Sequence, residues 1–279
     1  MINLAVQTLW TKPLHLNNDI RGGAFFGFEK MEYFLASAYL SFNQLKRNGY
    51  RVHLYTDNYG KSLLVDQLKL KYDYIDLSHE TLDLNPNLWA FCKMYTHLKQ
   101  TEPFIHVDLD AFIFNDFTLK FKSENIIFQN IESNFDYYKK MWKILRPHIK
   151  SNNKISHQIR SILDTEKPFH AMNVGIFGGN NISAIKTYVE DAITFLNLNI
   201  KHMPDEVKFY FCIFVEQMYC YYYHYFNNIT TTPLYKEGNK QVDDFIDWDN
   251  YTHLISSVKG NQIYINKVIE LSKSIGYDS

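Results

Sequence analysis

Residues 104–114 are Phe104-Ile105-His106-Val107-Asp108-Leu109-Asp110-Ala111-Phe112-Ile113-Phe114. This apolar segment is interrupted by two carboxylates, and its short length predicts a central strand of an α/β sheet. Asp108 and Asp110 are two residues apart, so on extended chain both side chains point to one face. At the carboxyl end of a central strand, that face opens onto the crevice where α/β sheets bind ligands. Two hard oxygen ligands at this place are typical of a Mg2+ or Mn2+ site with a bound diphosphate.

The Asp-x-Asp pattern also has a simpler interpretation as a loop cap or a solvated turn. The apolar residues on both sides favour the metal site, because a solvated turn does not need them. Charged side chains in a buried strand are almost always paired or metal-bound.

Hydrophobic periodicity on either side of this strand alternates between strand and helix patterns. Residues 2–9 predict a first strand, residues 28–48 a helix that stops at Asn48-Gly49, and residues 52–56 a second strand. This βαβ unit implies parallel pairing with a right-handed crossover. Later strands are expected at residues 74–77, 126–129 and 171–177, a short strand or loop at 251–254, and helices at 89–99, 136–163 with a break at Pro147, 182–196, 205–225 and 263–274. The alternation predicts an α/β fold with a mixed, mostly parallel central sheet flanked by helices, in one domain over residues 1–279.

Composition excludes several classes of function. The chain has 279 residues and a formal net charge of −1, from 29 Lys and Arg against 30 Asp and Glu. This balance argues against a nucleic-acid binder that works by neutralising phosphates. The three cysteines, Cys92, Cys212 and Cys220, lie in apolar or aromatic surroundings without a CxxC motif, which predicts no disulfide framework and a cytoplasmic location. The sequence shows no signal peptide pattern and no run of about 20 apolar residues, so we expect no transmembrane segment.

Two features of the second half could belong to a site. Gly175 lies inside a predicted strand, which suggests close approach by a ligand or by another backbone. Glu216-Gln217 lies within an unusually aromatic helical block, where a buried glutamate needs a partner or a chemical role. A glutamate on a polar helix face explains the sequence equally well. The aromatic segment 209–226 could form a platform for sugar rings, although such clusters are more often core.

Several motifs occur in one order along nearly the whole chain: Trp10-Thr11-Lys12-Pro13, Leu54-Tyr55-Thr56-Asp57, Trp89-Ala90-Phe91-Cys92-Lys93, Asp108-Leu109-Asp110, Asn173-Val174-Gly175, Glu216-Gln217, and Tyr251-Thr252-His253-Leu254 followed by Lys259. The ordered set resembles the GT-A class of nucleotide-sugar glycosyltransferases, distantly the glycogenin-like and capsular-sugar-transferase-like groups. Most narrowly it is similar to a bacterial family of GT-A-like proteins with no assigned activity. The resemblance implies a GT-A, Rossmann-like fold and a nucleoside-diphosphate sugar donor, with a UDP-sugar favoured.

The resemblance assigns the metal and phosphate ligands. Asp110 matches the carboxylate that binds Mn2+ or Mg2+ directly, and Asp108 the one that touches the metal or the donor ribose. His253 matches the third protein ligand, although a lone histidine is more often structural. Lys259 matches a donor-phosphate contact, and Lys93 a basic residue facing the diphosphate or sugar. A solvated helix lysine is the alternative for Lys93.

The resemblance also assigns the rest of the site. Thr56 and Asp57 match the nucleotide-base end. Asn173 and Gly175 match the sugar and acceptor side, and Glu216-Gln217 the place of a catalytic or sugar-orienting acid or amide. The implied acceptor is a glycan, a lipid-linked molecule or a peptide.

The end of the chain departs from the glycogenin-like pattern His-x-x-Gly-x-Lys-Pro-Trp. The corresponding residues are His253-Leu254-Ile255-Ser256-Ser257-Val258-Lys259-Gly260, so serine replaces glycine and Pro-Trp is absent. The resemblance implies retaining transfer. Glu216 is the one candidate base for inverting transfer, so the residues alone leave the stereochemistry open.

Two other functions compete with glycosyl transfer. A haloacid-dehalogenase-type phosphatase also places Asp-x-Asp after an apolar strand, but near the N-terminus and with Thr or Val where this chain has Phe112. A GT-A-like protein that has lost catalysis and serves as a binding module is the second, because a fold does not determine a function. Loss of a metal ligand favours that alternative, whereas both carboxylates and the late histidine are present.

Overall fold

The computed structural model divides the chain into two compact units. It describes residues 2–15, 25–115, 126–133, 135–150, 154–165, 169–235 and 246–278. Unit 1 comprises Met1–Pro86, Phe104–Lys122 and Lys240–Ser279, and unit 2 comprises Asn87–Pro103 and Ser123–Asn239. Each unit therefore contains segments that are distant in sequence. That the whole chain is one domain stays a prediction.

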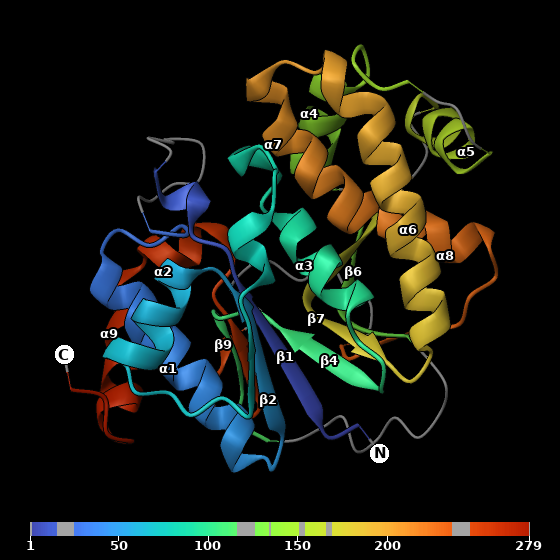
Figure 1. Cartoon of the computed structure of the whole chain (residues 1–279). Coiled ribbons are helices and arrows are strands. Elements are labelled where there is room, and N and C mark those ends of the chain that lie inside the picture. The colour runs from blue at the N-terminus through green and yellow to red at the C-terminus, as the bar shows by residue number, and fades with distance from the viewer. Residues whose placement is uncertain are drawn as a thin grey trace. The chain divides into compact units, whose positions relative to one another are not determined.

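Unit 1 contains a parallel sheet in the order β3-β2-β1-β4. These strands are β1 Leu4–Leu9, β2 Arg51–Thr56, β3 Tyr74–Asp76 and β4 Phe104–Val107. In the register, Val6 of β1 lies opposite His53 of β2 and His106 of β4. Figure 1 shows β1 and β2 side by side. The central strands β1 and β4 are almost completely buried, as expected for parallel strands covered on both faces, whereas the edge strand β3 is partly exposed.

A small antiparallel sheet of unit 1 follows directly on β4. Its strands are β5 Ala111–Ile113, β9 Ile246–Asp247 and β10 Tyr251–His253, in the order β5-β10-β9. His253 pairs with Ala111, so this sheet brings the end of β10 beside the residues that follow β4.

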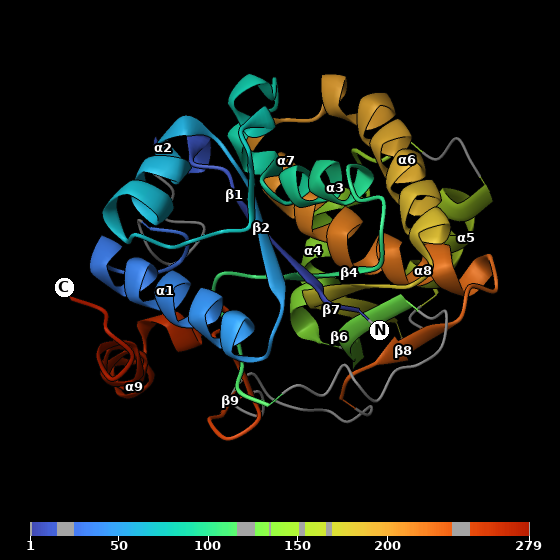
Figure 2. The same cartoon turned by 60° about the horizontal axis from the view of Figure 1, so that its bottom comes forward.

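The described part of unit 1 has the helices α1 Met31–Arg47, α2 Asn58–Lys61 and α9 Gln262–Lys273. The two long ones, α1 and α9, lie beside each other. Figure 2 shows α9 next to α1, where the Ser272 hydroxyl donates to the carbonyl of Ala36 at 2.9 Å. Helix α1 ends as predicted: Asn48 is its C-cap, and Gly49 follows with a φ of +81°, a conformation that favours glycine.

Unit 2 contains β6 Ile126–Ser133, β7 His170–Gly179 and β8 Thr231–Pro233. β6 pairs antiparallel with β7 and parallel with β8, and a bulge interrupts the β6–β7 register between Phe128 and Asn130. Its helices are α3 Ala90–Leu98, α4 Asp136–Leu145, α5 Lys154–Leu163, α6 Ile182–Asn199, α7 Asp205–Ile213 and α8 Cys220–Phe226.

The predicted fold class is confirmed. In unit 1 the pairs β1–β2, β1–β4 and β2–β3 are parallel, and α1 packs on β2. In unit 2 the pair β6–β8 is parallel and β6–β7 is antiparallel, and α8 packs on β7. The helical block predicted at 205–225 differs in one respect. A π-helical turn, Phe214–Tyr219, separates α7 from α8 and contains Glu216 and Gln217. Because aromatic residues surround this block on all sides, its sequence carries no periodicity that could reveal the wider turn.

The Gly60→Ala variant is expected to be less stable than the wild type. A Cβ atom at Gly60 would lie 2.1 Å from the buried Thr56 hydroxyl, and the carboxylate of Asp57 and the side chain of Leu9 close the same space. Crowding of this kind costs about 1–3 kcal/mol of unfolding free energy. Equilibrium urea unfolding measures it, with Gly260→Ala as the matched control, because nothing lies within 4 Å of a Cβ there. Equal stability of the two variants would contradict the close approach.

Candidate functional site

The predicted strand and its two carboxylates are found at the carboxyl edge of the parallel sheet of unit 1. β4 ends at Val107, and β5 begins at Ala111 in the other sheet. The residues between them form a turn, in which the amide of Ala111 donates to the carbonyl of Asp108 at 3.1 Å. The two aspartates therefore converge from a turn rather than from extended chain, which an alternation argument could not anticipate.

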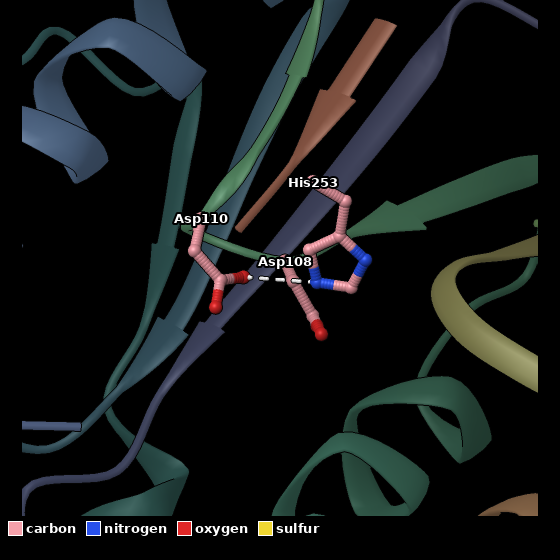
Figure 3. Close-up of side chains that lie close together, drawn as sticks. All are labelled: Asp108, Asp110 and His253. Atoms are coloured by element: carbon pink, nitrogen blue, oxygen red, sulfur yellow. Dashed lines mark ion pairs between the residues drawn. The ribbon is translucent and has the colours of Figure 1, made fainter. Parts of the chain in front are cut away.

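Asp108, Asp110 and His253 form a cluster whose candidate ligand atoms all lie within 4.8 Å of one another. The imidazole Nε2 of His253 lies 3.5 Å from Oδ1 of Asp110, and Figure 3 shows the three side chains turned toward a common point. The side chains of Asp108, Asp110 and His253 are 18%, 14% and 8% exposed. Two carboxylates and one imidazole fit Mg2+ or Mn2+. The cluster brings together the three residues predicted to bind the metal.

Two serines of α1 hold the turn that carries the aspartates. The Ser37 hydroxyl donates to the carbonyl of Leu109 at 3.0 Å, and the Ser41 hydroxyl contacts the carbonyls of Ala111 at 2.8 Å and Asp108 at 3.2 Å. Both serines are completely buried. Sequence analysis missed them, although two serines four residues apart on an otherwise apolar helix face signal hydroxyls with buried partners.

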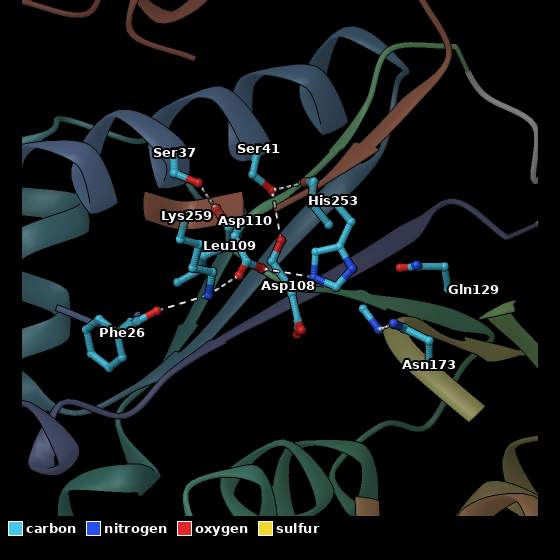
Figure 4. A network of polar contacts seen from close by, with 12 residues as sticks. Phe26, Ser37, Ser41, Asp108, Leu109, Asp110, Gln129, Asn173, His253 and Lys259 are labelled. Atoms are coloured by element: carbon cyan, nitrogen blue, oxygen red, sulfur yellow. Dashed lines mark hydrogen bonds and ion pairs between the residues drawn. The ribbon is translucent and has the colours of Figure 1, made fainter. Parts of the chain in front are cut away.

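Lys259 lies beside the cluster and adds a positive charge to it. It lies on a 3₁₀ helix, Ser256–Gly260, and its Nζ is 2.5 Å from Oδ2 of Asp110. The same ammonium donates to the carbonyl of Phe26 at 3.0 Å (Figure 4). Burial raises the pKa of the Asp110 carboxyl, but the charge of Lys259 and the hydrogen bond from His253 outweigh it and hold that pKa well below its usual range. Asp110 is therefore a carboxylate, the form that binds cations.

His106 lies behind the cluster and was not predicted as a site residue. Its Nδ1 is 3.6 Å from Oδ1 of Asp108, and its Nε2 is 3.0 Å from the hydroxyl of Thr8 on β1. Histidine partners of this kind orient a ligating carboxylate. The apolar neighbours of His106 in the sequence gave no sign of this contact.

Thr56 and Asp57, predicted at the nucleotide-base end, lie at the end of β2 on the same sheet edge of unit 1. Thr56 is completely buried, and its hydroxyl faces Gly60. Asp57 caps α2 by accepting from the amide of Gly60 at 2.8 Å, and it accepts from both the amide and the hydroxyl of Thr11 at 2.6 and 2.8 Å. These contacts join the chain after β1 to the chain after β2. A role in nucleotide binding stays a prediction.

The other predicted residues lie in unit 2, and two of them form an ion pair. Lys93 Nζ on α3 is 2.9 Å from Oε1 of Glu216, with side-chain exposures of 12% and 6%. The ammonium of Lys93 also lies 5.2 Å from the centre of the Trp89 ring. The buried glutamate thus has the partner that its burial required. Lys93 is correspondingly not a solvated helix lysine.

Asn173, Gly175 and Gln217 meet through two residues that sequence analysis missed, Glu132 and Tyr138. The side-chain amide of Asn173 donates to Oε1 of Glu132 at 2.8 Å, and its carbonyl accepts from the amide of Gly175 at 3.1 Å. The Tyr138 hydroxyl hydrogen-bonds the other Glu132 oxygen and lies 2.7 Å from Oε1 of Gln217. Glu132 follows the bulge of β6, and bulges are frequent next to active sites. In sequence these partners are too far apart for a motif to connect them.

Two buried histidines of unit 2, His97 and His224, are expected to make the protein less stable at acidic pH. Burial lowers the pKa of His97 to about 3, with the charge of Lys93 adding to the effect. Burial lowers the pKa of His224 to about 4, against a hydrogen bond to the Cys220 carbonyl that raises it. Unfolding therefore takes up protons, so the stability contributed by these neutral rings is complete above about pH 6.5 and is lost as the pH falls.

We expect each of these histidines to lower the unfolding free energy by about 1.4 kcal/mol per pH unit between pH 6.5 and its folded-state pKa. The ring of His97 is stacked on Phe177 with centroids 5.3 Å apart, so His97→Phe keeps the packing. The variant should lose less unfolding free energy than the wild type as the pH falls below about 6.5. Urea unfolding between pH 7.5 and 5 measures the slope. His202→Gln, at an exposed position, should leave it unchanged. An unchanged slope in His97→Phe would contradict the account.

Comparison with known proteins gives a family. A model of a family of unknown function, DUF6734, matches residues 4–274, so the chain belongs to that family. The search of curated proteins gives no match. The matched family has no assigned activity. That it is the bacterial GT-A-like family that the sequence motifs resemble stays a prediction.

Three solved structures are similar to the chain at low identity. One is the galactosyltransferase LgtC in complex with donor and acceptor sugar analogues, with a TM-score of 0.45 and 9% identity over 99% of this chain and 97% of that one. Another is the inositol-1-phosphate CTP transferase from T. maritima, with a TM-score of 0.45 and 12% sequence identity; the match covers 100% of this chain and 98% of that one. The third is the bifunctional glycosyltransferase WbbM, with a TM-score of 0.40 and 11% sequence identity; the match covers 84% of this chain and 39% of that one. All three likenesses are distant.

Within the residues that the structure describes, no helix has the length and apolar character needed to cross a membrane.

Proposed function

We propose that this member of a family of unknown function is a metal-dependent glycosyltransferase, which moves a sugar from a nucleoside-diphosphate sugar to an acceptor hydroxyl. The observation that carries the proposal is the convergence of Asp108, Asp110 and His253, with Lys259 beside them, at the carboxyl edge of a parallel sheet. Ligands of α/β sheets bind at this edge. The donor set suits Mn2+ or Mg2+, and a UDP-sugar is the favoured donor.

The chemistry of sugar transfer fits these residues. A divalent cation held by Asp108, Asp110 and His253 would stabilise the negative charge that builds on the leaving diphosphate. Lys259, whose ammonium lies next to Asp110, would supply a second positive charge to the same phosphates. Asp110 stays ionised, because the charge of Lys259 and the hydrogen bond from His253 favour its charged form.

The resemblance to GT-A enzymes assigns sugar and acceptor roles to polar residues of unit 2, and we propose these roles for them. Glu216 and Gln217 are the proposed catalytic or sugar-orienting groups, and Oε1 of Glu216 lies 2.9 Å from the ammonium of Lys93. Asn173, fixed by Glu132 and by the amide of Gly175, presents an oriented amide of the kind that binds sugar hydroxyls. Retaining transfer is the proposed outcome, with a glycan, lipid-linked or peptide acceptor.

A thermal-shift panel tests the proposal. UDP-, GDP- and CDP-sugars are each added with and without Mn2+, because a ligand that binds the folded state raises its stability by about 2.7 kcal/mol at about 100 times Kd. We expect a rise in Tm that requires both Mn2+ and one class of nucleotide. No rise with any combination would favour the alternative of a binding protein without catalysis, and hydrolysis of a generic phosphate ester would favour the phosphatase.

A further inference from the structure

Lys259 makes three contacts that together place its charge on the metal cluster. Its Nζ lies 2.5 Å from Oδ2 of Asp110, donates to the carbonyl of Phe26 at 3.0 Å and lies 5.1 Å from the centre of the Phe28 ring. The side chains of Lys259 and Asp110 are 15% and 14% exposed, so water screens this pair only weakly. Asp110 is thus shared between the imidazole of His253 at one oxygen and the ammonium at the other (Figure 4).

We propose that Lys259 is a built-in counter-ion of the metal site and competes with the divalent cation for Asp110. This inference rests on the proposed metal site and adds a regulation to it. A cation bound to Asp110 would lie a few ångströms from an ammonium that already neutralises the same carboxylate. Two positive groups at that distance repel strongly where little water screens them. The cluster should therefore bind a divalent cation only weakly while Lys259 stays in place.

The turn at Phe26 provides contacts that Lys259 can keep when its ammonium moves away from Asp110. Phe25 and Phe28 exchange backbone hydrogen bonds at 2.9 and 3.1 Å, and between them Phe26 and Gly27 have φ values of 54° and 91°. A phenylalanine in the left-handed region is uncommon and persists only where its surroundings hold it. Here the Phe26 ring packs on Phe34 with centroids 4.6 Å apart. The strained turn directs the Phe26 carbonyl at Nζ, so Lys259 can leave Asp110 and keep two of its three contacts.

The arrangement couples metal binding to anion binding. An anionic ligand such as a diphosphate attracts the ammonium away from Asp110 and so restores that carboxylate to the cation. Coupling of this kind is reciprocal, so the cation raises the affinity for the anion by the same factor. The cluster then takes up metal and diphosphate together rather than metal alone.

Calorimetric titration with MnCl2 alone, without nucleotide, tests the competition. The variant is Lys259→Met, which keeps the length of the side chain and removes its charge. We expect it to bind Mn2+ at least about tenfold more tightly than the wild type. Lys259→Arg keeps the charge and should bind like the wild type. Lys267→Met is the matched control, because Lys267 is paired with Glu270 on the exposed face of α9.

The possible failures separate the two proposals. Equal or weaker Mn2+ binding by Lys259→Met would overturn the role of Lys259 and leave the metal site standing. If neither the wild type nor Lys259→Met binds Mn2+, the metal site is overturned, and the proposed function with it. If Lys259→Met is too unstable to titrate, the Mn2+-induced rise in the Tm of Lys259→Gln replaces the titration. A rise larger than in the wild type supports the competition, and an equal or smaller rise contradicts it.

Discussion

Replacing Asp110 with asparagine is expected to abolish Mn2+ binding and, with it, Mn2+-dependent binding of the donor. The substitution keeps the shape of the side chain and removes the charge at the centre of the cluster. Asp110 is the residue that contacts both His253 and Lys259. Changes to the outer partners of a metal ligand cost about 10–100-fold in affinity. Loss of a ligand itself should therefore cost at least about a hundredfold, measured by calorimetric titration with MnCl2 in the presence of UDP, where the wild type is expected to bind the cation well.

The same substitution should also affect folding. From the sequence alone we expect little cost of losing the Asp110 side chain, but the ion pair with Lys259 is mostly buried. Removing one partner of a fully buried pair costs about 3–5 kcal/mol, so a cost of about 1–3 kcal/mol is expected for this partly exposed one. Asp66→Asn, at a surface carboxylate 3.6 Å from Lys61, is the matched control and should change neither property. Undiminished Mn2+ affinity in Asp110→Asn would show that the cation does not use this carboxylate.

Replacing Glu216 with glutamine is expected to give the largest loss of stability. The substitution removes the carboxylate that lies 2.9 Å from Lys93 inside unit 2, where both side chains are nearly buried. Breaking a buried ion pair costs about 3–5 kcal/mol, because a charge is left in a medium that solvates it poorly. The stacking of Lys93 over the Trp89 ring retains part of the interaction. Equilibrium urea unfolding measures the loss.

Two comparisons make this prediction specific. The double variant Lys93→Met with Glu216→Leu removes both charges and should recover most of the lost stability. Lys46→Met breaks an ion pair with Asp73 whose side chains are 35% and 37% exposed, and it should cost less than about 1 kcal/mol. A Glu216→Gln variant as stable as Lys46→Met would contradict a structural role for the pair. If such a variant also lost transferase activity, Glu216 would act in the chemistry alone.

The site residues that could be predicted are those that stand out in the sequence from their immediate neighbours. Asp108 and Asp110 interrupt an apolar strand, and a charge in that position needs an explanation. His253 could be named only because its surroundings resemble a known pattern, and the pairing of β10 with β5 is what brings it to the aspartates. The class of fold followed from alternating strand and helix patterns in the same way.

The rest depends on contacts between distant segments, which composition and spacing do not record. Ser37 and Ser41 hold the aspartate turn from a helix about 70 residues earlier in the chain. Glu132 and Tyr138 hold Asn173 and Gln217 across 41 and 79 residues. Each of these side chains is an ordinary polar residue in sequence. Its role follows only from the burial that requires it to find a partner.

Binding of a UDP-sugar to the wild-type protein, measured calorimetrically with and without Mn2+, tests the central claim most directly. The cluster of Asp108, Asp110 and His253 predicts that the sugar nucleotide binds measurably only when Mn2+ is present. A GDP- or CDP-sugar that behaves in this way would support the metal site and change only the nucleotide. Binding of the same strength with Mn2+ and with a chelator, or no binding of any sugar nucleotide, would contradict a metal-dependent glycosyltransferase.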